Sequence, residues 1–166
     1  RRMNHLETLV AEYLDWQGFL VRRNTKVGKL AHGGWAMELD IVGYNPHTGI
    51  IVHYEPSSDA HTWAKREERF GAKFARGREY IFTELFTWLS EDIEIEQIAI
   101  CPSHPKGRNT LGGGRLISID EFIHEVRTAV AAKGPLRQHA ISETYPLLRT
   151  IQLMMCGYNS VFTPAR

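Results

Sequence analysis

The apolar residues of the N-terminal segment recur at helical spacing. Between residues 4 and 17 they are Leu6, Leu9, Val10, Tyr13, Leu14 and Trp16. This period predicts an amphipathic helix. Glu7 follows Asn4 by three residues, which is the spacing of a capping box, and Gly18 is expected to end the helix.

The pattern then changes to alternation. Residues 19–27 are predicted to form a strand, and in 35–44 apolar residues alternate with polar ones. Residues 50–54 are a second apolar run, which Glu55 closes. The segment 45–49 between them (NPHTG) is rich in turn-forming residues. The two runs therefore predict an antiparallel hairpin.

A long amphipathic helix is predicted from Ala60 onwards. Its apolar stripe comprises Trp63, Phe70, Phe74, Ile81, Leu85 and Trp88. The basic residues roughly opposite this stripe are Lys65, Arg69 and Arg76. Lys73 lies at the border of the stripe, and Gly77 is a point at which the helix is expected to break. By this pattern Trp63, Phe70 and Phe74 are core residues.

The remaining segments complete an α/β pattern. In order they are a strand at 93–100, a loop at 102–115, a short strand at 116–119, a helix at 120–132 and a last helix at 142–156. Residues 110–115 within the loop are expected to be a flexible surface segment. An open mixed sheet flanked by helices accommodates this order. The length predicts a single domain over residues 1–166, with a helical extension at about 134–166.

Composition indicates a folded, water-soluble chain. Hydrophobic residues make up 43% and charged residues 23% of the sequence, as in globular proteins. No apolar run reaches the ~18 residues of a membrane span, so no membrane partner and a cytoplasmic location are expected. Two scattered cysteines indicate neither a disulfide framework nor a zinc site.

Charge is balanced overall but uneven along the chain. The formal net charge is +1, so the overall charge does not indicate a nucleic-acid partner. A local basic segment contains Arg22, Arg23, Lys26 and Lys29 and no acidic residue. A second lies in residues 60–80 and includes the basic positions of the predicted long helix. Any polyanion would therefore meet local basic patches.

Asp40 and Glu55 form the candidate chemical centre. They lie on the two strands of the predicted hairpin, and a splayed hairpin can direct both carboxylates into one cleft. Two nearby carboxylates suit a hard divalent cation such as Mg²⁺ or Mn²⁺, and their like charge is expected to raise the pKa of one of them. Such an ion supports phosphodiester hydrolysis by polarising a phosphate and lowering the pKa of a bound water. Glu7 could add a third carboxylate.

Two stretches carry a family resemblance. They are LETLVAEYLDWQGFLVRRNTKV and MELDIVGYNPHTGIIVHYEPSS. Glu7 and Ala11 match the start of the helical pattern E-x-x-x-A-x-x-Y-L-x-x-x-G, and Tyr13, Leu14 and Gly18 follow it with one residue fewer after the alanine. Glu38-Leu39-Asp40 matches E-(I/L)-D, and Glu55-Pro56-Ser57-Ser58 stands where E-x-K-(S/T) is found. Over about residues 4–58 the chain thus resembles the PD-(D/E)xK nucleases, especially the small Holliday-junction-resolvase-like endonucleases.

The resemblance implies a restriction-endonuclease-like fold and a Mg²⁺- or Mn²⁺-dependent endonuclease that acts on DNA. Asp40, Glu55 and the Pro56 carbonyl would bind the metal, and Glu7 would assist through a second ion or a water. The phosphate contacts would come from Lys65, Arg69 and Arg76. The resemblance leaves open a homodimer, and also a domain of a larger protein.

One position departs from the family pattern. Ser57 stands where these nucleases usually carry the lysine that stabilises the transition state. In some members this role moves to the following helix, which makes Lys73 the candidate here and Lys65 the second. The alternative is a catalytically inactive nuclease-fold domain that binds DNA or protein. Asp40 and Glu55 could also be ordinary solvated strand ends, and Glu7 only a capping carboxylate.

Overall fold

The computed structural model describes residues 5–159 of the chain. Asn4, with its predicted capping role, and the outer ends of the predicted motif region (4–58) and C-terminal extension (134–166) lie outside the described residues. The chain divides into two compact units, the first up to Ile119 and the second from Asp120. The single domain expected from the length stays a prediction.

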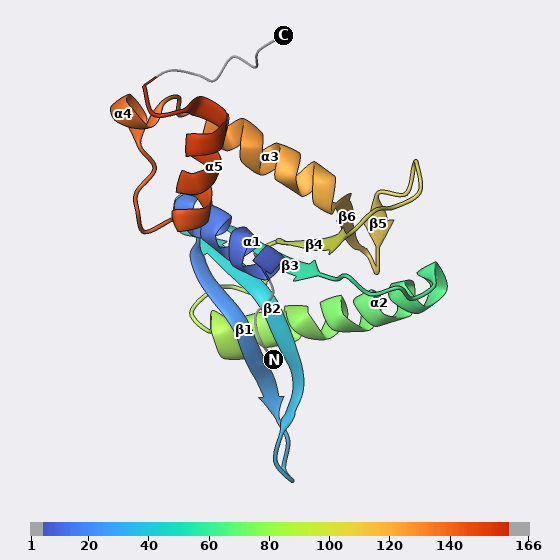
Figure 1. Cartoon of the computed structure of the whole chain (residues 1–166). Coiled ribbons are helices and arrows are strands. Elements are labelled where there is room, and N and C mark those ends of the chain that lie inside the picture. Colours follow the sequence, from blue (N-terminus) through green and yellow to red (C-terminus); the bar gives the residue numbers. More distant parts are fainter. Residues whose placement is uncertain (1–4, 160–166) are drawn as a thin grey trace. The chain divides into compact units, whose positions relative to one another are not determined.

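The first unit contains a six-stranded mixed sheet (Figure 1). Its strands are β1 (Leu20–Lys29), β2 (Trp35–Asn45), β3 (Ile50–Pro56), β4 (Ile95–Cys101), β5 (Thr110–Leu111) and β6 (Gly114–Ser118). Their order in the sheet is β1-β2-β3-β4-β6-β5. β1, β2 and β3 form an antiparallel meander, and β4 and β6 continue the sheet in parallel with β3. The predicted α/β class and the predicted hairpin are confirmed.

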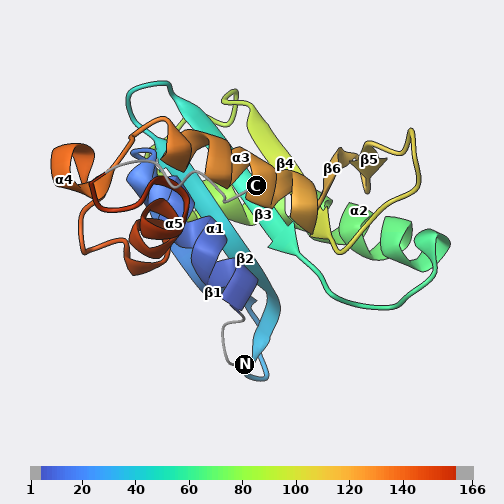
Figure 2. The same ribbon diagram turned by 45° about the horizontal axis from the view of Figure 1, so that its top comes forward.

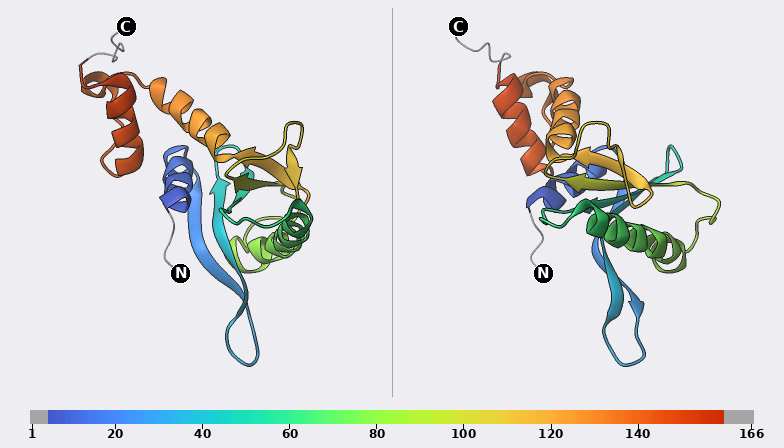
Figure 3. Two further views of the ribbon diagram at one scale, coloured as in Figure 1. Left: turned by 45° about the vertical axis from the view of Figure 1, so that its right-hand side comes forward. Right: turned by 90° about the vertical axis from the view of Figure 1, so that its right-hand side faces the viewer.

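Two helices lie on opposite faces of this sheet (Figures 2 and 3). The first is α1 (His5–Trp16), and the second is α2 (Trp63–Tyr80). α2 begins three residues later than expected because Thr62 caps it, its side chain accepting a hydrogen bond from the Lys65 backbone N–H. The expected break at Gly77 is wrong: Gly77 is buried inside α2, which continues into a π-helical turn, η1 (Ile81–Leu85).

The core on the α2 side of the sheet has two clusters. The first comprises Val27, Leu39, Val42, Ile51, Ile81, Phe82, Leu85, Phe86 and Ile95. The second comprises Phe70, Phe74, Ala99, Cys101, Leu111 and Leu116. Trp63 is half-buried against the second cluster, and Trp88, assigned to the apolar stripe, is 66% exposed because the chain turns after η1. The core prediction therefore holds for Phe70 and Phe74 and in part for Trp63, and the predicted apolar stripe does not remain buried as far as Trp88.

The expected flexible segment at 110–115 is also corrected. Thr110–Leu111 and Gly114–Ser118 pair as an antiparallel hairpin at the edge of the sheet. Gly112 has a φ of 59° and lies so close to Phe70 and Gly71 of α2 that a side chain there would overlap their backbone. The glycines of this segment thus permit a tight turn to pack on α2.

The second unit is helical. It contains α3 (Ile119–Ala131), α4 (Leu136–His139) and α5 (Pro146–Cys156). The buried Gln152 amide donates to the Gly134 and His139 carbonyls and accepts from the Ile141 N–H, which ties α5 to the segment before it. Within residues 5–159 there is no helix of the length and apolarity that crossing a membrane requires.

Candidate functional site

A pocket of about 360 Å³ lies where β3 ends beside α2. Its walls are the carboxylates Asp40 and Glu55, the chain segment 56–59, and the α2 residues Arg69, Phe70 and Lys73. The structure therefore brings three of the four predicted catalytic residues, together with Pro56, to one pocket.

The two carboxylates meet as predicted. Asp40 is 2% and Glu55 1% exposed. The Asp40 backbone N–H donates to Glu55 Oε1 at 3.3 Å. Lys73 Nζ donates to Glu55 Oε2 and lies 3.3 Å from Asp40 Oδ2. Both carboxylates thus contact one ammonium group and face the same pocket.

Strand register explains this convergence. The last β2–β3 pair towards the pocket is Ile41 with Tyr54, so Asp40 and Glu55 occupy the next position, beyond the end of the ladder. A strand pair that stops can splay, and here the Asp40 N–H bonds to the Glu55 side chain. Pro56, which offers no backbone N–H, is the last residue of β3. The pair therefore lies where the hairpin opens.

Lys73 reaches the pair from α2. Its side chain is 30% exposed, which fits a residue at the border of the buried face. A long aliphatic stem can lie on apolar surface while its ammonium meets the acids. The placement predicted for a migrated lysine is confirmed, whereas its catalytic role stays a prediction. Lys65 is exposed and is not a wall of the pocket.

His53 is a site residue that the sequence analysis missed. It is completely buried, and its Nε2 lies 2.7 Å from Glu55 Oε1. Its ring makes an edge contact with Phe74 at 5.4 Å between centroids. Gln97 Nε2 lies 3.4 Å from His53 Nδ1 and donates to the Phe74 carbonyl at 2.8 Å. The signal was available: His53 and Glu55 are two residues apart on one strand and so share a face.

These neighbours determine the charge state of Glu55. Burial on its own would raise the pKa of Glu55. The hydrogen bond and charge of His53, the charge of Lys73 and a hydrogen bond with Asp40 outweigh it and lower the pKa to about 2. The raised pKa expected for one carboxylate of the pair is therefore not found at Glu55, because the hydrogen bond from His53 and the positive charge of Lys73 stabilise its ionised form.

A second polar cluster forms the rim of the pocket. Asp59 Oδ2 accepts from Ser57 Oγ at 2.7 Å and from Arg69 Nη1 at 2.6 Å, and Arg66 Nε donates to Asp59 Oδ1 at 3.0 Å. Burial, the largest single effect, raises the pKa of Asp59, but its hydrogen bonds, first from Ser57 and then from Arg66, together lower that pKa well below the usual range. Asp59 was not predicted from the sequence, because its contacts with Arg66 and Arg69, seven and ten residues away, follow no simple pattern.

The predicted phosphate-binding residues are only partly gathered at the pocket. Arg69 is a wall of the pocket and its side chain is 48% exposed, although it is paired with Asp59. Lys65 and Arg76 are exposed on α2 and are not pocket walls. Their predicted role stays a prediction.

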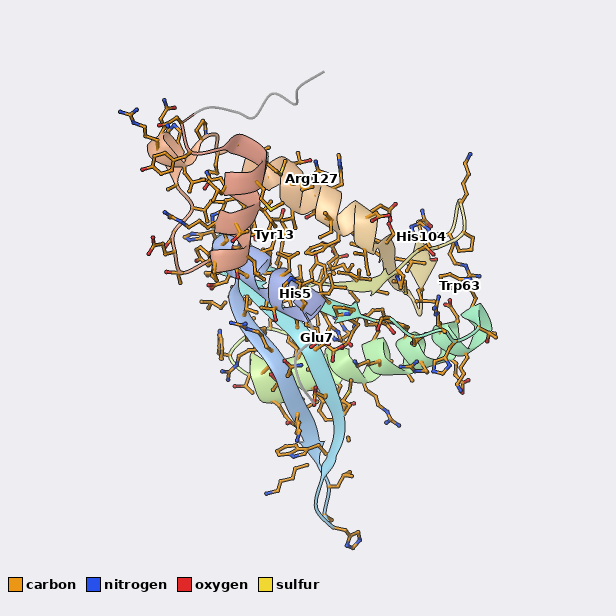
Figure 4. The ribbon with its side chains drawn as sticks, viewed as in Figure 1. His5, Glu7, Tyr13, Trp63, His104 and Arg127 are labelled. Atoms are coloured by element: carbon orange, nitrogen blue, oxygen red, sulfur yellow. The ribbon has the colours of Figure 1, made fainter. Side chains whose placement is uncertain are left out.

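Glu7 is placed differently from the pair. It lies in the first turn of α1 (Figure 4). Its side chain is completely buried and accepts a hydrogen bond from Asn24 Nδ2 at 3.2 Å. Asn24, which has a φ of 44°, lies 3.5 Å from Glu38 Oε1 as well. Among residues 5–159 no group of three or more His, Cys, Asp or Glu side chains is arranged to hold an ion. Glu7 is therefore not gathered with Asp40 and Glu55 as a third ligand, and its assisting role stays a prediction.

The donor set at the pocket suits Mg²⁺ or Mn²⁺ in type. Mg²⁺ commonly keeps several waters and is held by only one or two protein carboxylates, which Asp40 and Glu55 could supply. Pro56 could add its carbonyl at the pocket wall. The Lys73 ammonium contacts both carboxylates, so an ion would compete with it for them. No model of a known protein family matches the chain, and no curated protein matches it.

Proposed function

We propose that this chain is a metal-dependent endonuclease of the restriction-endonuclease-like fold that hydrolyses phosphodiester bonds in DNA. The observation that carries the proposal is the meeting of Asp40, Glu55 and Lys73 in one pocket. Two carboxylates and one cation suit a reaction whose transition state gains negative charge on a phosphate. The resemblance of residues 4–58 to PD-(D/E)xK nucleases supports the same activity.

The chain's own residues divide the work as follows. Asp40, Glu55 and the Pro56 carbonyl would hold Mg²⁺ or Mn²⁺, which when bound polarises the phosphate and lowers the pKa of a water. Lys73 supplies the positive charge that Ser57 lacks, and lies near the scissile phosphate. His53 orients Glu55 from behind, so it is a positioning residue. Glu7 assists from α1.

The DNA backbone would run along the pocket rim. Arg69 at the rim, with Lys65 and Arg76 on the exposed face of α2, would contact phosphates on either side of the scissile bond. Such contacts fix the register of the DNA without reading its sequence. A cytoplasmic location is part of the same proposal.

A second candidate function is a catalytically inactive nuclease-fold domain that binds DNA or protein. The observation in its favour is that Lys73 already compensates both carboxylates without an ion. A closed ion-pair cluster of this kind could be retained for stability alone, since a buried carboxylate that loses its partner is strongly destabilising.

Cleavage assays separate the two candidates. Purified protein with Mg²⁺ or Mn²⁺ is incubated with supercoiled, linear and branched DNA, and Asp40→Ala serves as the control for contaminating nuclease. We expect metal-dependent cleavage by the wild type and none by Asp40→Ala. Lys73→Ala should lower the rate by about 100-fold or more, because it removes a transition-state charge. Lys65→Ala, which removes an exposed lysine of the same helix, should have a small effect.

Two outcomes would change the assignment. Cleavage that survives Lys73→Ala but not Asp40→Ala would reject Lys73 as the replacement for the motif lysine. No metal-dependent cleavage of any substrate by the wild type would favour the inactive binding domain. Circular dichroism of each variant shows whether a lost activity reflects a lost fold.

A further inference from the structure

The β1–β2 hairpin is longer than the sheet to which it belongs. Pairing of β2 with β3 stops at Ile41, whereas pairing of β2 with β1 continues to Trp35, opposite Lys29. Residues 25–39 therefore form a two-stranded ribbon, here called the arm, that extends past β3 (Figures 1 and 3). The base of the arm is packed, because Val27 and Leu39 belong to the core cluster around Ile81 and the Gly28 N–H donates to Glu84 of η1 at 2.9 Å. Residues 29–35 beyond it are exposed, so the length of this outer part needs an explanation other than sheet stability.

The arm and the strand leading into it are basic. No Asp or Glu occurs between Asp15 and Glu38. That stretch contains four basic residues, all exposed: Arg22, Arg23, Lys26 and Lys29. The arm also contains one acid, Glu38, which is half-buried opposite Lys26 and lies 3.5 Å from Asn24 Nδ2, so the exposed charged residues of the arm are Lys26 and Lys29. The rest of the chain offsets this charge, since the total is only +1. The arm is therefore a local positive surface on a nearly neutral molecule, which favours a polyanion as its partner.

The end of the arm is exposed and partly apolar. Leu30 is 50% and Trp35 45% exposed. The turn between them closes with the Gly33 N–H donating to the Leu30 carbonyl at 3.1 Å, and Gly33 and Gly34 both have φ near 90°. A narrow tip with one large aromatic ring and flanking lysines can enter a groove that a bulkier element cannot.

The arm begins at the proposed active site. Asp40 directly follows its last residue, and Trp35 is five residues further along β2. At ~3.3 Å per residue the tip is about 16 Å from Asp40. This length corresponds to about five base pairs of a duplex at 3.4 Å each. A duplex with one phosphate at the pocket would therefore pass beside the arm within half a helical turn.

We propose that the arm is a second contact surface for duplex DNA, with its ribbon in the major groove and its lysines on the flanking phosphates. The proposal rests on the proposed function for its substrate, but the contact itself needs no catalysis. The major groove of B-form DNA admits a two-stranded β-ribbon, whereas that of duplex RNA is too deep and narrow. Two copies of this arm would repel each other, so self-association through it is disfavoured.

Binding measured without metal tests the arm separately from cleavage. A fluorescent 20-base-pair DNA is titrated with the full chain in EDTA at several salt concentrations. We expect Lys26→Ala/Lys29→Ala to weaken binding about tenfold and to reduce the slope of log K against log salt by about 2. The matched control, Arg127→Ala/Arg137→Ala, removes the same charge from exposed sites on α3 and α4 and should leave the slope unchanged.

The tip is tested by a second matched pair. Trp35→Ala should weaken binding of the duplex about fivefold, as loss of an aromatic anchor does. Trp88→Ala removes a more exposed tryptophan outside the arm and should leave binding unchanged. All four variants change exposed side chains, so melting temperatures close to that of the wild type are expected.

The outcomes distinguish failure of the arm from failure of the nuclease. Equal effects in the arm and control variants, tighter binding of duplex RNA, or no binding of duplex DNA by the wild type would overturn the arm proposal. A Trp35→Ala change that alters the oligomeric state but not DNA binding would overturn it too, in favour of a second copy. Arm-dependent binding by a wild type that never cleaves would overturn the nuclease and retain the arm.

Discussion

Glu55 is the residue on which the candidate site depends most. It accepts from His53 on one oxygen and from Lys73 on the other. Both neighbours favour the ionised form, and together they outweigh the cost of burial, so the pKa is about 2 rather than 4.5. Its ionised state is therefore coupled to folding, which makes it measurable without any knowledge of substrate.

The stability of the wild type should fall at acid pH because of this residue. A carboxyl whose pKa is lowered on folding stabilises the protein above its unfolded pKa, and that contribution disappears as pH falls from about 4.5 through about 2. A shift from 4.5 to about 2 corresponds to roughly 3 kcal/mol. Urea unfolding of the wild type and Glu55→Gln between pH 2 and pH 6 measures it. The wild type should be the more stable at pH 6, and the gap should close towards pH 2.

If the difference in stability between the wild type and Glu55→Gln is the same at every pH, the lowered pKa of Glu55 is wrong. Asp59 is the useful comparison because its pKa is also lowered, by Ser57, Arg66 and Arg69, at a more exposed position. Asp59→Asn should change how stability depends on pH at acid pH. In the Asp59→Asn background, Glu55→Gln should still lower stability at pH 6, and that difference should still close towards pH 2.

Site residues could be predicted from the sequence where they occupy a recognisable pattern. Asp40, Glu55 and Lys73 were predicted from strand ends and from the border of a helical stripe, and the structure brings them together. His53 was missed because it lies in an apolar strand, where a single polar residue forms no pattern that marks it as part of a site. Glu7 was predicted to lie near the pair, but its side chain accepts a hydrogen bond from Asn24 of β1. The positive φ of Asn24 has no signature in the local sequence pattern.

Helices and strands were predicted best where the hydrophobic period continues over many residues. The first helix, the three-strand meander and the long second helix all occupy about the residues expected. β6 was predicted as a short strand at 116–119, but β5 and its hairpin with β6 were missed, because the Gly-rich sequence has too few side chains to show a period and its place depends on contact with α2. η1 was missed for a different reason: its residues continue the apolar period of α2, so the change to π-helical hydrogen bonding leaves no sign in the sequence pattern.

Gly77 shows how packing overrides helix propensity. A Cβ at Gly77 would lie 2.6 Å from His53 Cε1 and 3.3 Å from Leu39 Cδ2, whereas one at Gly71 would meet nothing closer than the Gly112 Cα at 3.8 Å. Alanine is favoured over glycine in a helix by about 1 kcal/mol, but overpacking costs about 1–3 kcal/mol. We expect Gly77→Ala to destabilise the fold and Gly71→Ala to be neutral or stabilising, as measured by urea unfolding.

If both variants are equally stable, α2 can move away from β3, and His53 is not held by the helix. A destabilised Gly77→Ala should also show an altered acid limb of its stability profile, because His53 is the group that the new methyl displaces and His53 helps to lower the pKa of Glu55. Gly71→Ala should leave that limb unchanged.

At the scale of the whole molecule, near-neutral charge coexists with two local surfaces suited to a phosphate backbone. One is the pocket rim with Arg69, and the other is the arm with Lys26 and Lys29. Both lie in the unit that ends at Ile119. The net charge of +1 predicts weak long-range attraction, so binding should depend on these local contacts and fall steeply with salt.

Metal binding should be visible in the stability of the whole chain, even where no substrate is known. An ion that binds only the folded state raises the free energy of unfolding by RT ln(1 + [M]/Kd), about 2.7 kcal/mol at a hundredfold excess over Kd. We expect Mn²⁺ or Mg²⁺ to raise the melting temperature of the wild type, and Asp40→Asn to abolish the rise. Lys73→Ala should enlarge the rise at a fixed ion concentration, because Lys73 competes with the ion for both carboxylates.

Asp59→Asn is the matched control for this experiment, since Asp59 is a carboxylate at the same pocket that Arg66 and Arg69 already engage. It should keep the response of the wild type. A rise that persists in Asp40→Asn would place the ion elsewhere, and a rise that is unchanged in Lys73→Ala would show that the lysine does not compete. A normal rise in melting temperature without cleavage of any DNA would show that the fold keeps its ion site but lacks the catalytic step. The two results are independent, because Lys73 competes with the ion for the carboxylates, whereas the cleavage rate depends on its charge near the phosphate.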